Sequence, residues 1–101
     1  MNFYRGDTFI KNLYVVLKNK IKYQFQKGDK VRVIFVNKKN KTLKKEIEIT
    51  DPVENVVIFY KPEETKDLTP TTYILEIEII TNDFTITKQI RLNVKEDYLN
   101  E

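Results

Sequence analysis

The sequence predicts an all-β fold, an immunoglobulin-like antiparallel β-sandwich of about seven strands, on three observations. Apolar and polar residues alternate through most of the chain, which is the period of half-buried strands. The alternating segments are short and are separated by turn residues at regular intervals, as in sandwiches. Helical periodicity is nearly absent. A small closed β-barrel is the alternative architecture. Since 101 residues is the usual size of one domain, we expect residues 1–101 to share a single core.

Four strands are expected in the first half of the chain. Residues 8–17 are rich in β-branched and aromatic side chains and predict a long strand that ends at a turn over Asn19 and Lys20. Alternation continues over 21–25, until Gly28 permits the positive φ that a tight turn often needs. It then predicts strands over 31–36 and 43–49, with a polar loop or hairpin tip at 37–41.

Three strands are expected in the second half. Asp51-Pro52 ends the preceding strand because proline cannot donate to the ladder, and 56–60 forms the next one. The polar stretch 61–72 is the longest connection. The last two strands, 73–79 and 84–94, form a hairpin through Asn82-Asp83. Residues 68–73 also resemble a tyrosine corner, in which the Tyr73 phenol would bond to the chain upstream; a buried tyrosine without that bond is the alternative.

The residue inventory argues against an enzyme. The chain contains no histidine, cysteine or serine, so the common general base, the thiolate nucleophile and the serine triad cannot be built. The usual nitrogen and sulfur ligands of a metal are missing as well. We therefore expect no catalytic residues, no cofactor and no metal site. The start of the chain lacks the apolar region of a signal peptide, and we expect no membrane partner.

Charge is distributed unevenly along the chain. Between residues 11 and 45, twelve lysines and arginines stand against one acid, a net of +11, whereas from residue 46 onward five bases face thirteen acids, a net of −8. The basic half suggests a partner-binding surface, which we place on these residues: Lys38, Lys39, Lys41, Lys44 and Lys45. A nucleic acid is one partner that such a surface could bind, and a small basic nucleic-acid-binding barrel is the corresponding alternative.

Two observations weigh against nucleic acid. The aromatic residues within the basic half share parity with core positions, and arginine, which dominates bidentate phosphate recognition, is scarce. The segregated charge could instead guide assembly with a partner protein or with a second copy. It could also cancel within the fold, if a strand carrying Lys44 and Lys45 lies beside Glu76 and Glu78.

An edge strand is expected at the start of the chain, over Asn2, Phe3, Tyr4 and Arg5. Edge strands carry unpaired backbone groups that a partner strand can extend. A carbohydrate-binding or adhesion module, the second alternative function, would need exposed aromatic side chains on one face, whereas the aromatics here mostly follow core parity.

Five short motifs together resemble a known family. They are Phe3-Tyr4-Arg5-Gly6-Asp7-Thr8-Phe9, Lys27-Gly28-Asp29-Lys30-Val31, Leu68 through Ile77, Thr85-Ile86-Thr87 and Leu92 through Asp97. In this order they resemble the N-terminal domain of phage baseplate upper proteins and related immunoglobulin-like domains of phage virion proteins. The chain departs from that pattern at Thr71 and Thr72, which stand where a glycine often precedes the tyrosine.

The resemblance implies a non-enzymatic phage structural or assembly protein, made in the host cytoplasm and located in the virion. Such a module would dock onto the tail, baseplate or capsid. Its partners would be other virion proteins or further copies of itself.

Overall fold

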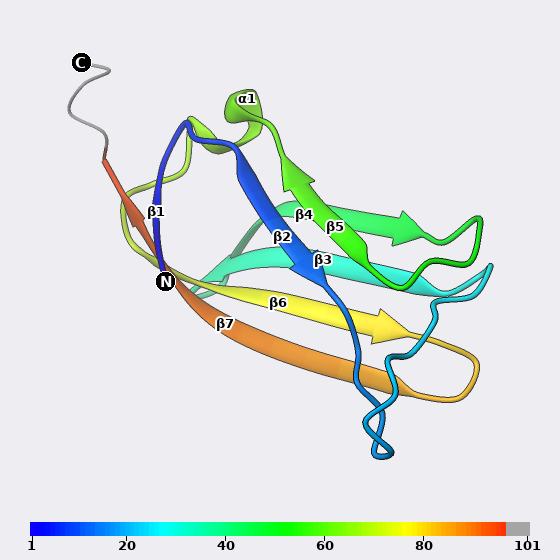
Figure 1. Ribbon diagram of the computed structural model, residues 1–101. Helices are drawn as coiled ribbons and strands as arrows, with labels where there is room; N and C mark the ends of the chain where they lie inside the picture. The colour runs from blue at the N-terminus through cyan, green and yellow to red at the C-terminus, as the bar shows by residue number, and fades with distance from the viewer. Residues whose placement is uncertain (97–101) are drawn as a thin grey trace.

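Two β-sheets pack against each other in the computed structural model, which describes residues 1–96 (Figure 1). The larger sheet has five strands in the order β1 (Asn2–Tyr4), β7 (Thr85–Lys95), β6 (Thr72–Ile80), β3 (Lys30–Asn37) and β4 (Asn40–Glu48). The smaller sheet pairs β2 (Phe9–Leu13) with β5 (Val56–Tyr60). The predicted all-β sandwich of about seven strands is confirmed, and the two separate sheets replace the barrel alternative.

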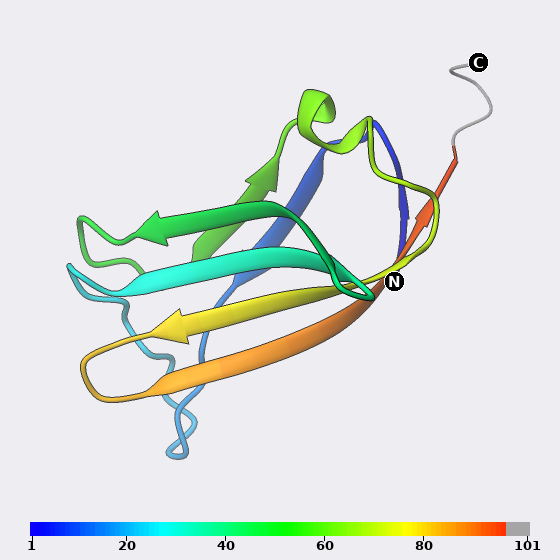
Figure 2. The ribbon, with the colours of Figure 1, turned by 180° about the vertical axis from the view of Figure 1, so that it is seen from behind.

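The strand order follows the immunoglobulin arrangement. In Figure 2 the larger sheet faces the viewer, with β4, β3, β6 and β7 running side by side. Strands β3, β6 and β7 correspond to C, F and G of an immunoglobulin domain, and β2 and β5 to B and E of the facing sheet. Every pair is antiparallel except that β1 pairs with the end of β7 in parallel. The short parallel pair of β1 with β7 lies at one edge of an otherwise antiparallel sandwich.

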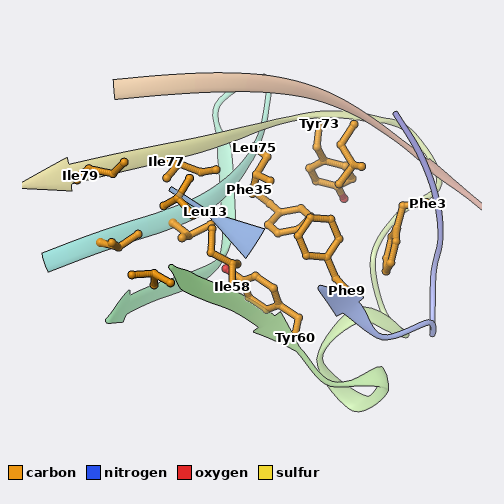
Figure 3. Close-up of a cluster of buried hydrophobic side chains, with 14 of the residues drawn as sticks. Phe3, Phe9, Leu13, Phe35, Ile58, Tyr60, Tyr73, Leu75, Ile77 and Ile79 are labelled. Carbon is orange, nitrogen blue, oxygen red and sulfur yellow. The ribbon is translucent and has the colours of Figure 1, made fainter. Parts of the chain in front are cut away.

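The core lies between the sheets and follows the predicted alternation. Strand β6 alternates strictly between buried and partly exposed residues, and its buried side faces β2 and β5 (Figure 3). Aromatic rings fill the centre: Phe9 meets both Phe35 and Tyr60 edge-on, at centroid distances of 5.8 and 6.1 Å. Such edge-on pairs contribute roughly 0.5–1.5 kcal/mol each beyond the area they bury.

Strand β4 contains a bulge a few residues after the tip of its hairpin with β3. The tip is only Lys38-Lys39, since Asn37 and Asn40 already pair. Further along, the register shifts between Val33 and Phe35, and Leu43 takes a φ of +53° in this bulge. The buried Tyr60 hydroxyl donates a hydrogen bond of 2.5 Å to the Leu43 carbonyl. Tyr60 therefore ties the bulge in β4 to the smaller sheet.

Two strand predictions in the first half are wrong. The strand expected over 8–17 ends at Leu13, because its partner β5 begins at Val56, the residue paired with Leu13. The strand expected over 21–25 does not form: this segment makes only the isolated bridges Val16–Lys22 and Phe25–Val53. The alternation still places Phe25 in the core, but no neighbouring strand in the described part of the chain pairs with this segment to form a ladder. The turn over Asn19 and Lys20 does form, with the Leu17 amide bonded to the Ile21 carbonyl.

The predicted turns of the other connections form as well. Gly28 has a φ of +95° at the third position of a turn closed by the Asp29 amide and the Gln26 carbonyl. Asn82-Asp83 joins β6 to β7, and the Thr81 hydroxyl accepts hydrogen bonds from the Asp83 and Phe84 amides. Tyr73 is buried, but its hydroxyl bonds to no residue between 1 and 96, so the tyrosine corner is absent.

The connection from β5 to β6 contains a one-turn helix that the sequence did not predict, α1 (Pro62–Thr65). Proline suits the first helical position, and the Glu64 side chain accepts a hydrogen bond from the Lys61 amide. The buried Thr65 hydroxyl accepts from the Gly6 amide and donates to the Asp7 carbonyl. These bonds join the helix to the turn that follows β1.

Candidate interaction surfaces

The five lysines of the predicted basic surface do not lie together. Lys38 and Lys39 form the exposed tip between β3 and β4, and Lys41 and Lys44 are exposed along β4. Lys45 instead pairs across the sheet with the buried Val33 and lies on the inner side. The set is therefore split between two sides of the sheet.

Lys45 connects the two sheets. Its Nζ donates to the Phe59 carbonyl at 2.8 Å and to Glu64 Oε1 at 3.0 Å, and lies 4.4 Å from the centroid of the Tyr60 ring. The Lys61 amide and then the Lys45 ammonium hold the pKa of Glu64 below its usual value. The sequence alternation could have indicated that Lys45 faces inward, because Lys45 shares its parity with the apolar Leu43 and Ile47, and all three are partly buried along β4.

On the outer face of the larger sheet, the two charged halves of the sequence meet. Arg32 on β3 lies between Glu46 on β4 and Glu78 on β6, with N–O distances of 3.0 and 3.5 Å. The hydrogen bond from Arg32 lowers the pKa of Glu46. Arg32 therefore cancels charge between the two halves at this point. The expected contact of Lys44 and Lys45 on β4 with Glu76 and Glu78 on β6 is wrong, because β3 lies between these two strands.

This face is hollowed into an open depression of about 580 Å³ lined by both signs of charge, including Arg32, Lys41, Lys44, Glu76 and Glu78. Nucleic acid binding requires a continuous basic surface, because its affinity comes mainly from phosphate neutralisation. The interleaved acids weigh against that alternative.

The predicted edge strand at the start of the chain is short. Asn2, Phe3 and Tyr4 form β1, which pairs with Asn93, Val94 and Lys95 of β7. The Phe3 ring is buried at 5.3 Å from the Phe9 ring, while Arg5 forms an ion pair of 2.8 Å with Glu96. Asp97, which ends the closing motif of the resemblance, lies outside the described residues.

A longer open edge lies beside β1, on β7. The Val94 amide bonds to the Thr71 carbonyl on the β6 side, whereas the Asn93 amide bonds to the Met1 carbonyl on the β1 side. Because backbone groups alternate in direction along a strand, the amides of these residues point away from β6: Thr85, Thr87, Gln89 and Arg91. In the described part of the chain, no strand pairs with this side of β7 before β1 begins. Sequence could not reveal this edge because it depends on strand order.

The outer face of the smaller sheet is mostly apolar, with Asn12 as its polar residue. Ile10 of β2 pairs with Phe59 of β5, and both are exposed on the side away from the core, together with Val57. Burying such a patch stabilises a complex by roughly 25 cal/mol per Å² of apolar surface removed from water. The continuous apolar composition of β5 in the sequence was a signal for this patch.

A hollow of about 410 Å³ lies between the tip of the β3–β4 hairpin and the connection before β6. Its lining mixes polar and apolar surface, and the polar residues that line it include Asn37, Asn40, Asp67 and Thr69. Tyr73, only 5% exposed, also lines it, and its hydroxyl has no hydrogen-bond partner among residues 1–96. The lining residues therefore include hydrogen-bond donors and acceptors.

Asp29 is the most deeply buried carboxylate among residues 1–96. It accepts hydrogen bonds from the Tyr23 hydroxyl at 2.6 Å and from the Gln26 amide at 2.9 Å. Burial, and then the bond to Asp29, raise the pKa of Tyr23 to about 12. These contacts hold the turn before β3, so the pair has a structural role.

Residues 1–96 contain no group of three acidic side chains placed to hold a metal ion. No helix in that part of the chain is long and apolar enough to cross a bilayer. Comparison of the chain with protein-family models, curated proteins and solved structures finds no match.

Proposed function

We propose that the protein is a non-enzymatic structural module of a phage particle that docks onto tail, baseplate or capsid proteins. The observation that carries the docking role is the open edge of β7, where the amides of Thr85, Thr87, Gln89 and Arg91 pair with no strand among the residues that the structure describes. Proteins usually protect such edges by shortening, twisting or covering them, because unpaired backbone groups can pair with another chain. The exposed apolar patch of Ile10, Val57 and Phe59 supplies a second surface for protein contacts.

The assignment to a phage particle rests on the family resemblance of the sequence motifs. Lys27-Gly28-Asp29 lies in the turn before β3, and Tyr73 to Ile77 lies in the first part of β6. A virion module needs no catalytic residues, in agreement with the missing histidine, cysteine and serine. Its partners are other virion proteins or further copies of the chain.

The particle assignment is tested by mass spectrometry of gradient-purified phage particles and of the infected-cell lysate from which they come. We expect the protein at a fixed ratio to a known structural protein in the particles. Presence in the lysate together with absence from the particles would contradict the virion role.

A second candidate function, saccharide binding, is favoured by the hollow before β6 and by the Tyr73 hydroxyl, which bonds to no residue from 1 to 96. Amides, hydroxyls and a carboxylate are groups that recognise a polyhydroxylated ligand. The test is an NMR titration with mono- and oligosaccharides. Binding should shift Asn37 and Asn40 and weaken on Tyr73→Phe, whereas Tyr14→Phe, at an exposed tyrosine on another segment, should leave it unchanged. Shifts that are unaffected by Tyr73→Phe would rule out this candidate.

A further inference from the structure

We propose that the open edge of β7 binds an extended segment of a partner protein that carries an acidic residue between two apolar residues at alternate positions. This inference rests on the proposed docking function and specifies its partner. The edge supplies the backbone hydrogen bonds, and the inward-facing side chains of β7 select the sequence.

The backbone groups at this edge are already arranged for a strand. Thr85, Thr87 and Gln89 direct both their amides and their carbonyls away from β6. At Arg91 the carbonyl accepts a hydrogen bond from the Met1 amino group, while the amide has no partner strand among the described residues. Further along, β1 pairs with residues 93–95. A partner strand in line with β1 would therefore extend the same edge toward the start of β7.

The inner side of β7 determines which side chains fit opposite it. Ile86, Lys88 and Ile90 face the side of the core, opposite Ile79, Ile77 and Leu75 of β6. Ile86 is 38% exposed and Lys88 is exposed, because the smaller sheet has only two strands and does not cover this part of β7. Lys88 forms no ion pair with any residue from 1 to 96.

Cross-strand neighbours lie about 4.5–5.5 Å apart at Cβ and favour opposite charges or paired apolar groups. The complementary strand therefore places apolar residues opposite Ile86 and Ile90 and an acid opposite Lys88. The segment between β2 and β3, which contains the exposed Leu17 and Ile21, projects beyond β7 on this side (Figures 1 and 2).

Lys88 also argues against a second copy as the partner. A two-fold antiparallel pairing that used the whole stretch would set Thr85 opposite Arg91, and hence Lys88 opposite the same residue of the other copy. Like charges directly opposite each other destabilise a strand pair. An inward-pointing charge on an edge strand is a known protection against self-pairing. Lys88 therefore disfavours self-association and favours an acidic partner.

The test uses a synthetic heptapeptide with the sequence Thr-Val-Thr-Glu-Thr-Val-Thr. Its palindromic pattern places glutamate opposite Lys88 in either strand direction. At about 1 mM peptide, a range suited to weak complexes, we expect NMR shifts at the Thr85, Thr87, Gln89 and Arg91 amides, together with their slowed hydrogen exchange. The control peptide carries lysine in place of glutamate and should bind at least about tenfold more weakly.

Two protein variants separate the backbone contribution from the charge. Thr87→Pro removes an amide that points to the open edge and spares the ladder to β6, so it should fold and lose peptide binding. Lys88→Glu should invert the preference and bind the lysine peptide. The inference is overturned if the glutamate peptide leaves the β7 amides unshifted, if Thr87→Pro folds and binds equally well, or if Lys88→Glu keeps the original preference.

The same variants distinguish this inference from the proposed function. If Thr87→Pro protein enters phage particles as the unmodified chain does, the virion role stands and the β7 edge is not its docking site. If the protein is absent from particles while the glutamate peptide binds β7, the edge assignment stands and the virion role fails. Self-association of the unmodified chain through β7, seen by sedimentation and by loss of exchange at Thr87, would replace the acidic partner with a second copy.

Discussion

Replacing Lys45 with methionine removes the ammonium that joins β4 to the smaller sheet and keeps an unbranched apolar side chain. The Lys45 side chain is 30% exposed and contacts the Phe59 carbonyl, the Glu64 carboxylate and the Tyr60 ring. If Lys45 is structural, Lys45→Met should destabilise the fold; if it belongs to a basic binding surface, stability should be unchanged.

The magnitude follows from two of these contacts. The partly exposed hydrogen bond to the Phe59 carbonyl contributes about 1 kcal/mol, below the value for a buried charged donor. The cation–π contact with Tyr60 adds roughly 0.5–1 kcal/mol at a partly exposed site. We therefore expect Lys45→Met to lower the free energy of unfolding by about 1–2 kcal/mol, and Tm by about 5–10 °C for a chain of this length.

The matched control is Lys44→Met, one residue earlier on the same strand. Lys44 is exposed, and its side chain forms no hydrogen bond or ion pair with the residues that the structure describes. Urea unfolding followed by tyrosine fluorescence, with thermal melts by circular dichroism, measures both variants. Equal stability losses in the two variants, or no loss in Lys45→Met, would refute a structural role for Lys45.

Three further predictions concern the core and the turns. Tyr60→Phe should cost about 1–3 kcal/mol because the Leu43 carbonyl loses its donor. In urea titrations Tyr73→Phe, at a buried tyrosine whose hydroxyl bonds to none of the described residues, should stay close to the unmodified chain. Gly28→Ala should cost about 1–2 kcal/mol through its φ of +95° alone, since no atom lies within 4 Å of the added Cβ. Gly28→Asn should cost less, because asparagine tolerates positive φ; equal unfolding midpoints for glycine and alanine would contradict this. The pKa of Tyr23 is raised from 10.0 to about 12 in the folded chain. Its hydroxyl therefore ionises at a lower pH in the unfolded chain, so the free energy of unfolding should fall as pH rises through that range. Absorbance titration at alkaline pH should show this late ionisation, and Tyr23→Phe should flatten the decline; a steep decline unchanged in Tyr23→Phe would assign it to other groups.

The alternation of apolar and polar residues predicted a strand correctly where another strand pairs with the whole segment. Strand β5 is observed at its predicted residues, and β6 and β7 lie within one residue of their predicted ends. The 21–25 segment shows equally regular alternation, yet it buries Phe25 through the Tyr23–Phe25 edge contact and one bridge instead of through a ladder. Strand length depends on pairing with distant segments, which period alone does not specify.

The interaction surfaces were less predictable than the fold. Clustering of lysines in the sequence grouped Lys45 with Lys44, although successive residues of a strand face opposite sides. The open edge of β7 depends on β1 covering only its last three paired residues and on a facing sheet of two strands. Neither fact follows from local sequence, because both are properties of the strand order.

Amide hydrogen exchange by NMR tests most directly whether β7 presents an open edge in the free protein. We expect alternation along the strand: slow exchange at Ile86, Lys88 and Ile90, whose amides bond to β6, and fast exchange at Thr85, Thr87 and Gln89. Slow exchange at all six amides in the isolated chain would show that the edge is already paired and is not available to a partner strand.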